Sequence, residues 1–134
     1  MEDIFVGRLM SSPVETVSTD TPVHVAAETM IDDGIGSVIV TDDEDQLEGI
    51  LTATDFVRVA AEQRWAPDAT VETYMTDDVV TTTANEPVRD IADLMLEKGF
   101  HHVPVVDESE GVVGIVTTTD ITAYMSHVQT PSPS

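Results

Sequence analysis

The sequence predicts an α/β (α+β) fold built from two tandem, pseudo-symmetric β-α-β-β-α repeats, and three observations support this. The stretch over residues 49–55, Gly-Ile-Leu-Thr-Ala-Thr-Asp, returns over residues 114–120 as Gly-Ile-Val-Thr-Thr-Thr-Asp, 65 residues later (114 − 49 = 65). At that offset, residues 10–58 and 75–123 are identical at 16 of 49 positions without a gap. Each copy places a helical pattern before two short β-branched runs. Two copies of one supersecondary unit are expected to pack as a pair.

The first half of each repeat contains an extended piece and a helix. After a lead-in over residues 1–9, the extended pieces are expected over residues 15–18 and 80–83. The helices should begin around Pro22 and Pro87, because a polar residue followed by proline in the first turn is a helix-start signal. Both helices are expected to end just before a glycine that can adopt the left-handed cap conformation, at Asp33 and Lys98.

The second half of each repeat is predicted to be a β-hairpin followed by another helix. Two β-branched runs joined by an acidic turn predict hairpins over residues 37–51 and 102–116. The second helices are expected over residues 55–64 and 120–127. The chain would thus consist of one repeat over residues 1–66, a second over residues 67–128, and a disordered tail over residues 129–134.

The composition is strongly acidic. Asp and Glu total 26 against 5 Lys and Arg, for a formal net charge of −21, and the acids are spread over both repeats. This predicts a halophilic protein, since about 1 M salt shortens the Debye length to about 3 Å and screens self-repulsion. Nucleic-acid binding is disfavoured, because few cations can replace the counterions of phosphates. Without cysteine, a membrane-length apolar run or a signal-peptide start, we expect a cytoplasmic protein that has no disulfide and no membrane anchor.

The repeated Thr-x-Thr-Asp segment carries the most informative chemistry. In each copy it joins the end of a strand to the start of a helix. Threonine hydroxyls beside the unpaired N–H groups of a helix start suit a phosphate or carboxylate, and the aspartate can accept two hydrogen bonds from a ribose diol. The structural alternative is that Thr54 and Thr119 cap the helices, while Asp55 and Asp120 favour the first turn.

Because its motifs occur in the same order in both copies, the chain resembles a CBS-domain pair, the Bateman module, over nearly its whole length. Met-Ser-Ser-Pro-Val from residue 10 and Met-Thr-Asp-Asp-Val from residue 75 are similar to the family's opening motif. Residues 99–107, Gly-Phe-His-His-Val-Pro-Val-Val-Asp, are similar to its central strand, and both Gly-Ile-x-Thr-x-Thr-Asp stretches to its nucleotide-binding signature. The resemblance implies two units paired about a pseudo-twofold axis, with AMP, ADP, ATP or S-adenosylmethionine held in the cleft between the repeats.

The resemblance also implies which residues contact such a ligand. They are a threonine of each opening strand, the glycine, threonines and aspartate of each signature, and the start of the second central strand: Thr16, Gly49, Thr52, Thr54, Asp55, Thr81, His101, His102, Pro104, Gly114, Thr117, Thr119 and Asp120. In the family, a basic residue often meets ligand phosphates where His101 and His102 stand. His102 is the better candidate, and the alternative is that one histidine packs at the strand edge. The first repeat has Gly36 and Ser37 there, so its site matches less well.

The favoured function is a stand-alone regulatory module that senses an adenosyl metabolite and requires no cofactor. It would act on an unidentified regulated protein or through a homodimer, using apolar helix positions such as Val57, Ala60, Leu94 and Leu96. The alternative is a protein-interaction scaffold with vestigial pockets. An enzyme is not expected, because the sequence contains no nucleophile–base pair, no metal-ligand cluster and no Walker-type phosphate loop.

Overall fold

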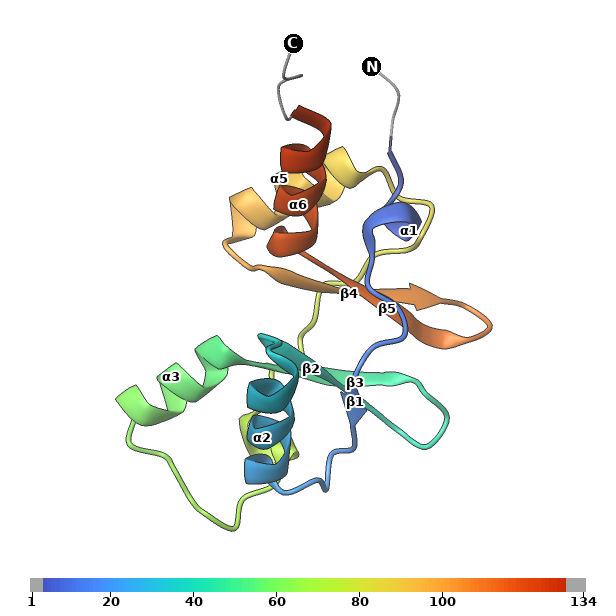
Figure 1. Ribbon diagram of the computed structural model, residues 1–134. Coiled ribbons are helices and arrows are strands. Elements are labelled where there is room, and N and C mark those ends of the chain that lie inside the picture. Colours follow the sequence, from blue (N-terminus) through green and yellow to red (C-terminus); the bar gives the residue numbers. More distant parts are fainter. Residues whose placement is uncertain (1–3, 130–134) are drawn as a thin grey trace. The chain divides into compact units, whose positions relative to one another are not determined.

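The computed structural model describes residues 4–129 (Figure 1). Its mixed helices and strands confirm the α+β class, in the order α1 (Val6–Leu9), β1 (Thr16–Val17), α2 (Val23–Asp33), β2 (Ser37–Thr41), β3 (Leu47–Thr52), α3 (Ala53–Ala61), α4 (Val71–Tyr74), α5 (Val88–Lys98), β4 (His102–Asp107), β5 (Gly111–Thr117) and α6 (Thr118–Gln129). The tail predicted over residues 129–134 lies outside the described residues except for Gln129, where α6 ends. Within the described range, no helix combines the length and apolar character needed to cross a membrane.

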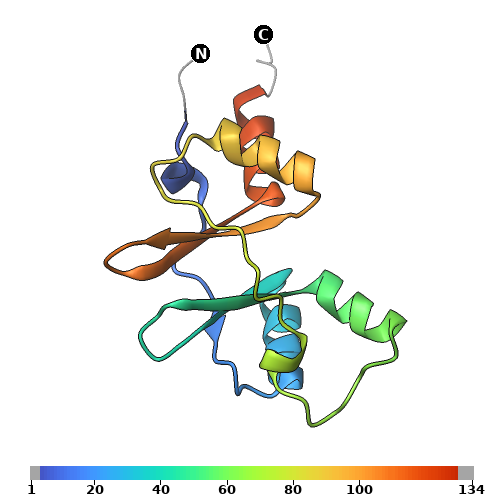
Figure 2. The same cartoon turned by 180° about the vertical axis from the view of Figure 1, so that it is seen from behind.

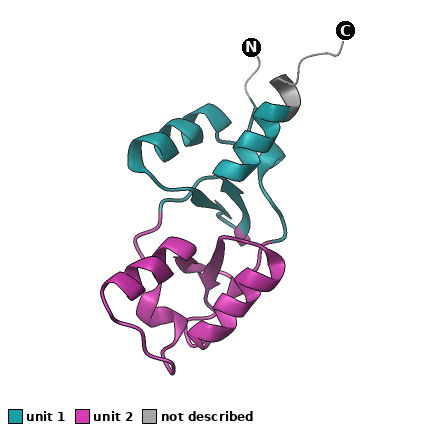
Figure 3. Ribbon diagram, turned by 60° about the vertical axis from the view of Figure 1, so that its left-hand side comes forward, with its two compact units in different colours: residues 1–13, 80–109, 113–134 teal, residues 14–79, 110–112 magenta. Residues whose placement is uncertain are grey.

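The chain folds as two compact units (Figure 3). Unit 1 comprises residues 1–13, 80–109 and 113–134, and unit 2 comprises residues 14–79 and 110–112. Unit 2 therefore contains the hairpin and long helices of the first sequence repeat, and unit 1 contains most of the hairpin and the long helices of the second.

Unit 2 is built on a three-stranded sheet in the order β1-β2-β3. The pairing of β1 with β2 is parallel and that of β2 with β3 antiparallel, with Ile39 opposite Ile50. Every residue of the central strand β2 is buried, as its continuous β-branched run indicates. Helix α2 contacts α4 beside this sheet (Figure 2). The buried core comes from α2, β2, β3, α3 and α4: Val23, Ala26, Met30, Val38, Val40, Leu51, Val59, Val71 and Tyr74.

Unit 1 follows the same plan with a smaller sheet. Strands β4 and β5 form a two-stranded sheet, and the extended piece predicted over residues 80–83 contributes only an isolated parallel bridge from Thr82 to Val105. The Thr82 N–H donates to the Pro104 carbonyl oxygen at 3.0 Å. Its core consists of Val6, Ile91, Met95, Val103, Val105 and Val116.

The first long helix of each repeat begins directly after the proline that the sequence indicated, but the polar cap expected there is absent. Pro22 is the N-cap of α2, which begins at Val23, and no side chain caps the helix. The Val23 N–H donates instead to the Ala69 carbonyl oxygen at 3.0 Å, which satisfies an amide that a polar cap would otherwise serve. Helix α5 repeats this arrangement with its own proline and the carbonyl oxygen of Ile4, at 2.7 Å. The predicted ends are confirmed: left-handed glycines follow both helices, at Gly34 and Gly99.

Two short helices, α1 and α4, lie where only a lead-in and a linker were expected. Each has four residues, too few to show a helical period in the sequence. They stand at the repeat offset (71 − 6 = 65), and each belongs to the unit that contains the other repeat's hairpin and long helices. The compact units therefore exchange the opening segments of the two repeats. The boundaries over residues 1–66 and 67–128 describe sequence repeats and stay a prediction.

Candidate functional site

Thr52 and Asp55 form a reciprocal capping box at the start of α3. The Asp55 N–H donates to Thr52 Oγ1 at 3.2 Å, and the Thr52 N–H donates to Asp55 Oδ2 at 2.9 Å. The Thr52 hydroxyl also lies 3.2 Å from Oδ2 and donates to it. The helix thus begins two residues earlier than predicted, and Thr54 is exposed in its first turn. The alternative that named Thr54 as the cap is wrong, because the capping box pairs residues three apart.

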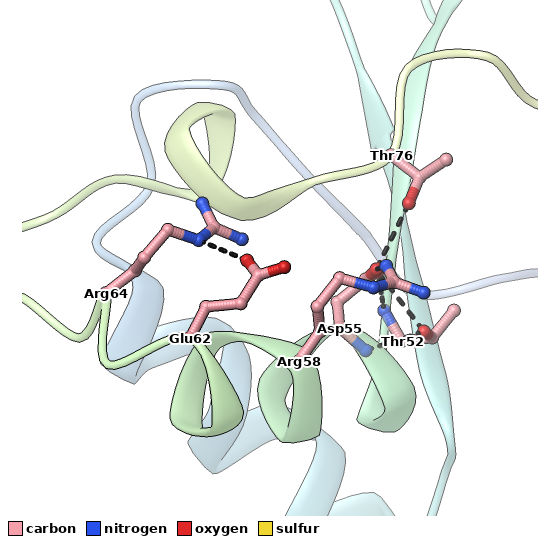
Figure 4. A network of polar contacts seen from close by, with 6 residues as sticks. All are labelled: Thr52, Asp55, Arg58, Glu62, Arg64 and Thr76. Carbon is pink, nitrogen blue, oxygen red and sulfur yellow. Dashed lines mark hydrogen bonds and ion pairs between the residues drawn. The ribbon is translucent and has the colours of Figure 1, made fainter.

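The second carboxylate oxygen of Asp55 is held from two sides (Figure 4). Arg58 Nη1 and Thr76 Oγ1 each donate to Asp55 Oδ1 at 3.1 Å. A carboxylate offers about four lone-pair positions, and four donors from Thr52, Arg58 and Thr76 are present here. The Asp55 residue is only 4% exposed. Because a ribose diol brings two donors, it could bind this carboxylate only by displacing some of its present partners.

The second signature has the same threonine cap, but its aspartate accepts fewer hydrogen bonds than Asp55 does. The Asp120 N–H donates to Thr117 Oγ1 at 3.1 Å, and the Thr117 N–H donates to Asp120 Oδ2 at 2.9 Å. Oδ1 accepts only a long hydrogen bond, 3.4 Å, from Ser11 Oγ among the described residues. Asp120 is half-buried, and Ala123 stands at the position of Arg58 (58 + 65 = 123). This carboxylate retains acceptor capacity that Asp55 lacks.

Glycine in each signature strand allows another backbone segment to come close. In unit 2, Ile50 and Thr76 form an antiparallel bridge, and a Cβ on Gly49 would lie 2.7 Å from the Thr76 carbonyl oxygen. In unit 1 the same bridge joins the strand to Ser11, and a Cβ on Gly114 would lie 3.0 Å from its carbonyl oxygen. These contacts place Thr76 and Ser11 beside the two aspartates. Whether Gly49 and Gly114 also contact a ligand stays a prediction.

His102 opens β4 in unit 1 and is half-buried, whereas His101 before it is exposed. Burial lowers the pKa of His102 from its ordinary value of 6.5, the neighbouring His101 lowers this pKa further, and Asp120 raises it in part. Burial dominates because it penalises the charged imidazolium. Neutral imidazole offers one N–H donor, so His102 near pH 7 is a hydrogen-bonding group more than a cation.

We expect His102 to make folding less favourable as the solution is acidified. Because its pKa is lower in the native state than in the unfolded chain, the unfolded chain takes up its proton first. The stability contribution of neutral His102 is complete above about pH 6.5 and is lost as the pH falls toward the native pKa. Thermal unfolding at about pH 7.5 and about pH 5 should therefore show a larger loss for the wild type than for His102→Gln.

The matched control for this pH effect is His24→Gln, which removes an exposed histidine on α2. Between the two pH values, this variant should lose as much thermal stability as the wild type loses. Comparing variants at the same pH cancels the titration of the 26 acidic side chains. Equal pH dependence in the wild type and His102→Gln would rule out a lowered native pKa.

The other predicted contact residues are divided between the units. Thr16 is exposed on β1 in unit 2, and Thr81 is exposed beside the Thr82 bridge in unit 1. Thr119 is exposed in the first turn of α6, as Thr54 is in α3. Pro104 is fully buried in β4, so its side chain serves packing. Unit 1 therefore contains Thr81, both histidines and the second signature.

Sequence reasoning missed the partners of the two aspartates. Ser11 and Thr76 occupy equivalent positions, one residue after the methionine of each opening motif. Arg58 follows Asp55 by three residues on a helix, a spacing at which side chains meet. The hydroxyl residues could have been noticed from the repeat offset, but their contact with the signature depends on tertiary structure. Among the side chains that the structure describes, no three of His, Cys, Asp or Glu are grouped so that they could hold a metal ion.

Tandem β-α-β-β-α units, each with a threonine-capped aspartate, define a module of the CBS type. The family model of the CBS domain matches the chain twice, over residues 6–62 and 71–127. Both matches include the signature and the preceding hairpin. The chain belongs to the CBS-domain family, and its fold is that of a CBS-domain pair.

Three similar proteins illustrate the family. The CBS domain pair of protein MJ0100, in a crystal structure with 5′-methylthioadenosine and S-adenosyl-L-methionine, is 30% identical with a TM-score of 0.86, covering 96% of this chain and 100% of that one. An uncharacterized 17.7 kDa protein of Acidianus ambivalens is 32% identical over 93% of this chain and 75% of its own length. The L-aspartate semialdehyde sulfurtransferase of Methanocaldococcus jannaschii is 34% identical over 87% of this chain and 22% of its own.

This chain spans less than two thirds of the length of several curated relatives that it matches. The match to the sulfurtransferase concerns the CBS module alone. The activity of such longer proteins therefore does not transfer with the shared module.

Proposed function

We propose that this protein is a regulatory module that senses an adenosyl compound through the signature of its second repeat. The observation that carries the proposal is the half-buried Asp120 carboxylate, fixed through Oδ2 by the Thr117 cap while Oδ1 keeps acceptor capacity. A fixed carboxylate can accept charge-assisted hydrogen bonds from the two hydroxyls of a ribose. His102 lies close enough to Asp120 for the carboxylate to raise the pKa of the imidazole in part. Its N–H adds a donor for a substituent of that sugar.

Charge narrows the class of ligand. The net charge of −21 repels anions at low salt, and neutral His102 contributes little positive charge. S-adenosylmethionine and AMP are therefore favoured over ADP and ATP. The similarity to the MJ0100 domain pair, crystallised with 5′-methylthioadenosine and S-adenosyl-L-methionine, supports the adenosyl class.

Asp120→Asn should weaken binding of S-adenosylmethionine and AMP by about 10- to 100-fold, the size expected when a hydrogen bond to a charged group is lost. The amide keeps the shape of the carboxylate but offers one acceptor oxygen and no charge. Isothermal titration calorimetry in molar KCl measures the affinities. 2′-Deoxyadenosine should bind the wild type more weakly than adenosine, because one diol hydroxyl is missing.

Asp93→Asn is the matched control, since it removes one negative charge from an exposed position of α5 in the same unit. It should leave both affinities unchanged. If the wild type binds no adenosyl compound at millimolar concentration, the sensing proposal fails and the interaction scaffold becomes the better account. Equal affinity of Asp120→Asn and wild type would remove Asp120 from the site.

The regulated partner, the cytoplasmic location and the homodimer are parts of the same proposal. Apolar side chains on three helices support the dimer, because Ile31, Val57 and Leu96 are 78%, 67% and 85% exposed. Leu94, also predicted as a dimer contact, is half-buried. A module whose role is to transmit ligand binding needs no catalytic group of its own.

A further inference from the structure

We propose that Arg58, together with Thr76, is an internal competitor that closes the first signature, so that each chain binds one adenosyl ligand, at the second. This inference rests on the proposed function and names the regulation of its site. The two signatures share their threonine cap and differ in what holds the remaining carboxylate oxygen.

The first step is the saturation of Asp55. Its Oδ2 accepts from the N–H and the hydroxyl of Thr52, and its Oδ1 accepts from Arg58 and Thr76 at 3.1 Å each. The side chain is 5% exposed, so water does not readily replace these partners. A ligand diol brings two donors to a carboxylate that already has four, and it must displace Arg58 and Thr76 from Oδ1 to bind.

The second step is the contrast with Asp120. Its Oδ1 accepts one long hydrogen bond, 3.4 Å, from Ser11, the equivalent of Thr76. At the position of Arg58, α6 carries the exposed methyl group of Ala123. No guanidinium is therefore available at this position to compete with a ligand. The open carboxylate also belongs to the unit that contains His101 and His102.

The third step is the exposure of Arg58. Its side chain is 54% exposed, so the ion pair with Asp55 contributes little to stability and can break without leaving a buried cation. Arg58 therefore acts mainly by occupying Oδ1. Removing the guanidinium together with the Thr76 hydroxyl should free Oδ1 without unfolding unit 2.

Exchanging the competitor between the signatures tests the inference. Ala123→Arg places a guanidinium three residues after Asp120, the spacing of Arg58 and Asp55. 5′-Methylthioadenosine is the probe, because it is uncharged and carries the ribose diol. Ala123→Arg should weaken its binding about tenfold relative to Ala123→Gln, a control of similar length without charge. Arg58→Gln/Thr76→Val should raise the calorimetric stoichiometry from one to two per chain, with circular dichroism confirming the fold.

The outcomes separate this inference from the proposed function. Wild-type binding of two ligands per chain, or equal binding by Ala123→Arg and Ala123→Gln, would overturn the competitor and leave ligand sensing intact. A double variant that is folded and still binds one ligand would also overturn it. Absence of binding by the wild type and by all variants would overturn both proposals. One site in the wild type, two in the double variant and a weakened site in Ala123→Arg would establish it.

Discussion

The melting temperature of this protein is expected to rise markedly between about 0.1 M and about 2 M KCl, because salt shortens the Debye length from about 10 Å to only a few Å. Five Lys and Arg side chains cannot neutralise 26 Asp and Glu side chains. The ion pairs Arg58–Asp55 and Arg64–Glu62 use two of those five. The remaining acids repel one another in the folded state more than in the expanded unfolded chain, so screening stabilises the fold.

Three comparisons identify screening as the cause of this rise. A domain of similar size with no net charge should gain much less over the same range. An uncharged osmolyte such as sucrose stabilises by exclusion from the surface and provides the background effect. Asp43→Asn/Glu44→Gln, in an exposed acidic turn, should reduce the salt dependence while leaving the turn contacts of Asp42 intact. Equal melting temperatures across the KCl range would refute the halophilic interpretation.

The sequence predicted the parts of the fold that local patterns encode. The hairpins follow from β-branched runs joined by an acidic turn, and the ends of α2 and α5 follow from Gly34 and Gly99. The start of α3 was misplaced because two threonines, Thr52 and Thr54, precede the same aspartate. Only the three-residue spacing of the capping box selects Thr52, and that spacing was available in the sequence.

The exchange of opening segments could not be predicted in the same way. The Val23 N–H donates to the carbonyl oxygen of Ala69, 46 residues later (69 − 23 = 46). No periodicity in either segment indicates this pairing. The same holds for Thr76 beside Asp55. The sequence did favour the second signature, on the ground that His101 and His102 replace Gly36 and Ser37. The geometry favours it for a different reason, the occupation of Asp55.

Asp55→Ala should destabilise the protein by about 3 kcal/mol, the largest effect expected of a single substitution in the two signatures. Loss of the hydrogen bond from the Thr52 N–H to Asp55 Oδ2, which is one half of the capping box, accounts for about 0.5–2 kcal/mol, while the Thr52 hydroxyl still caps the N–H of residue 55. The hydroxyl of Thr76 also loses a charged acceptor, at about 1.5–3 kcal/mol for such a bond, and the two effects overlap because one carboxylate accepts both hydrogen bonds. Arg58, half exposed, can return to water and adds little. The melting temperature should fall by roughly 10 °C.

Asp120→Ala is the matched comparison, because the residue has the same cap in an equivalent helix. It should cost about 1 kcal/mol, because it loses only the bond from the Thr117 N–H to Asp120 Oδ2 and the 3.4 Å contact with Ser11 contributes little. Measured by thermal unfolding without ligand in the same KCl concentration, the two variants should thus differ clearly in stability. Their order should reverse in ligand binding, where Asp120→Ala loses the open carboxylate. Equal destabilisation would mean that Arg58 and Thr76 do not hold Asp55 in solution, and the asymmetry of the signatures would then lose its physical basis.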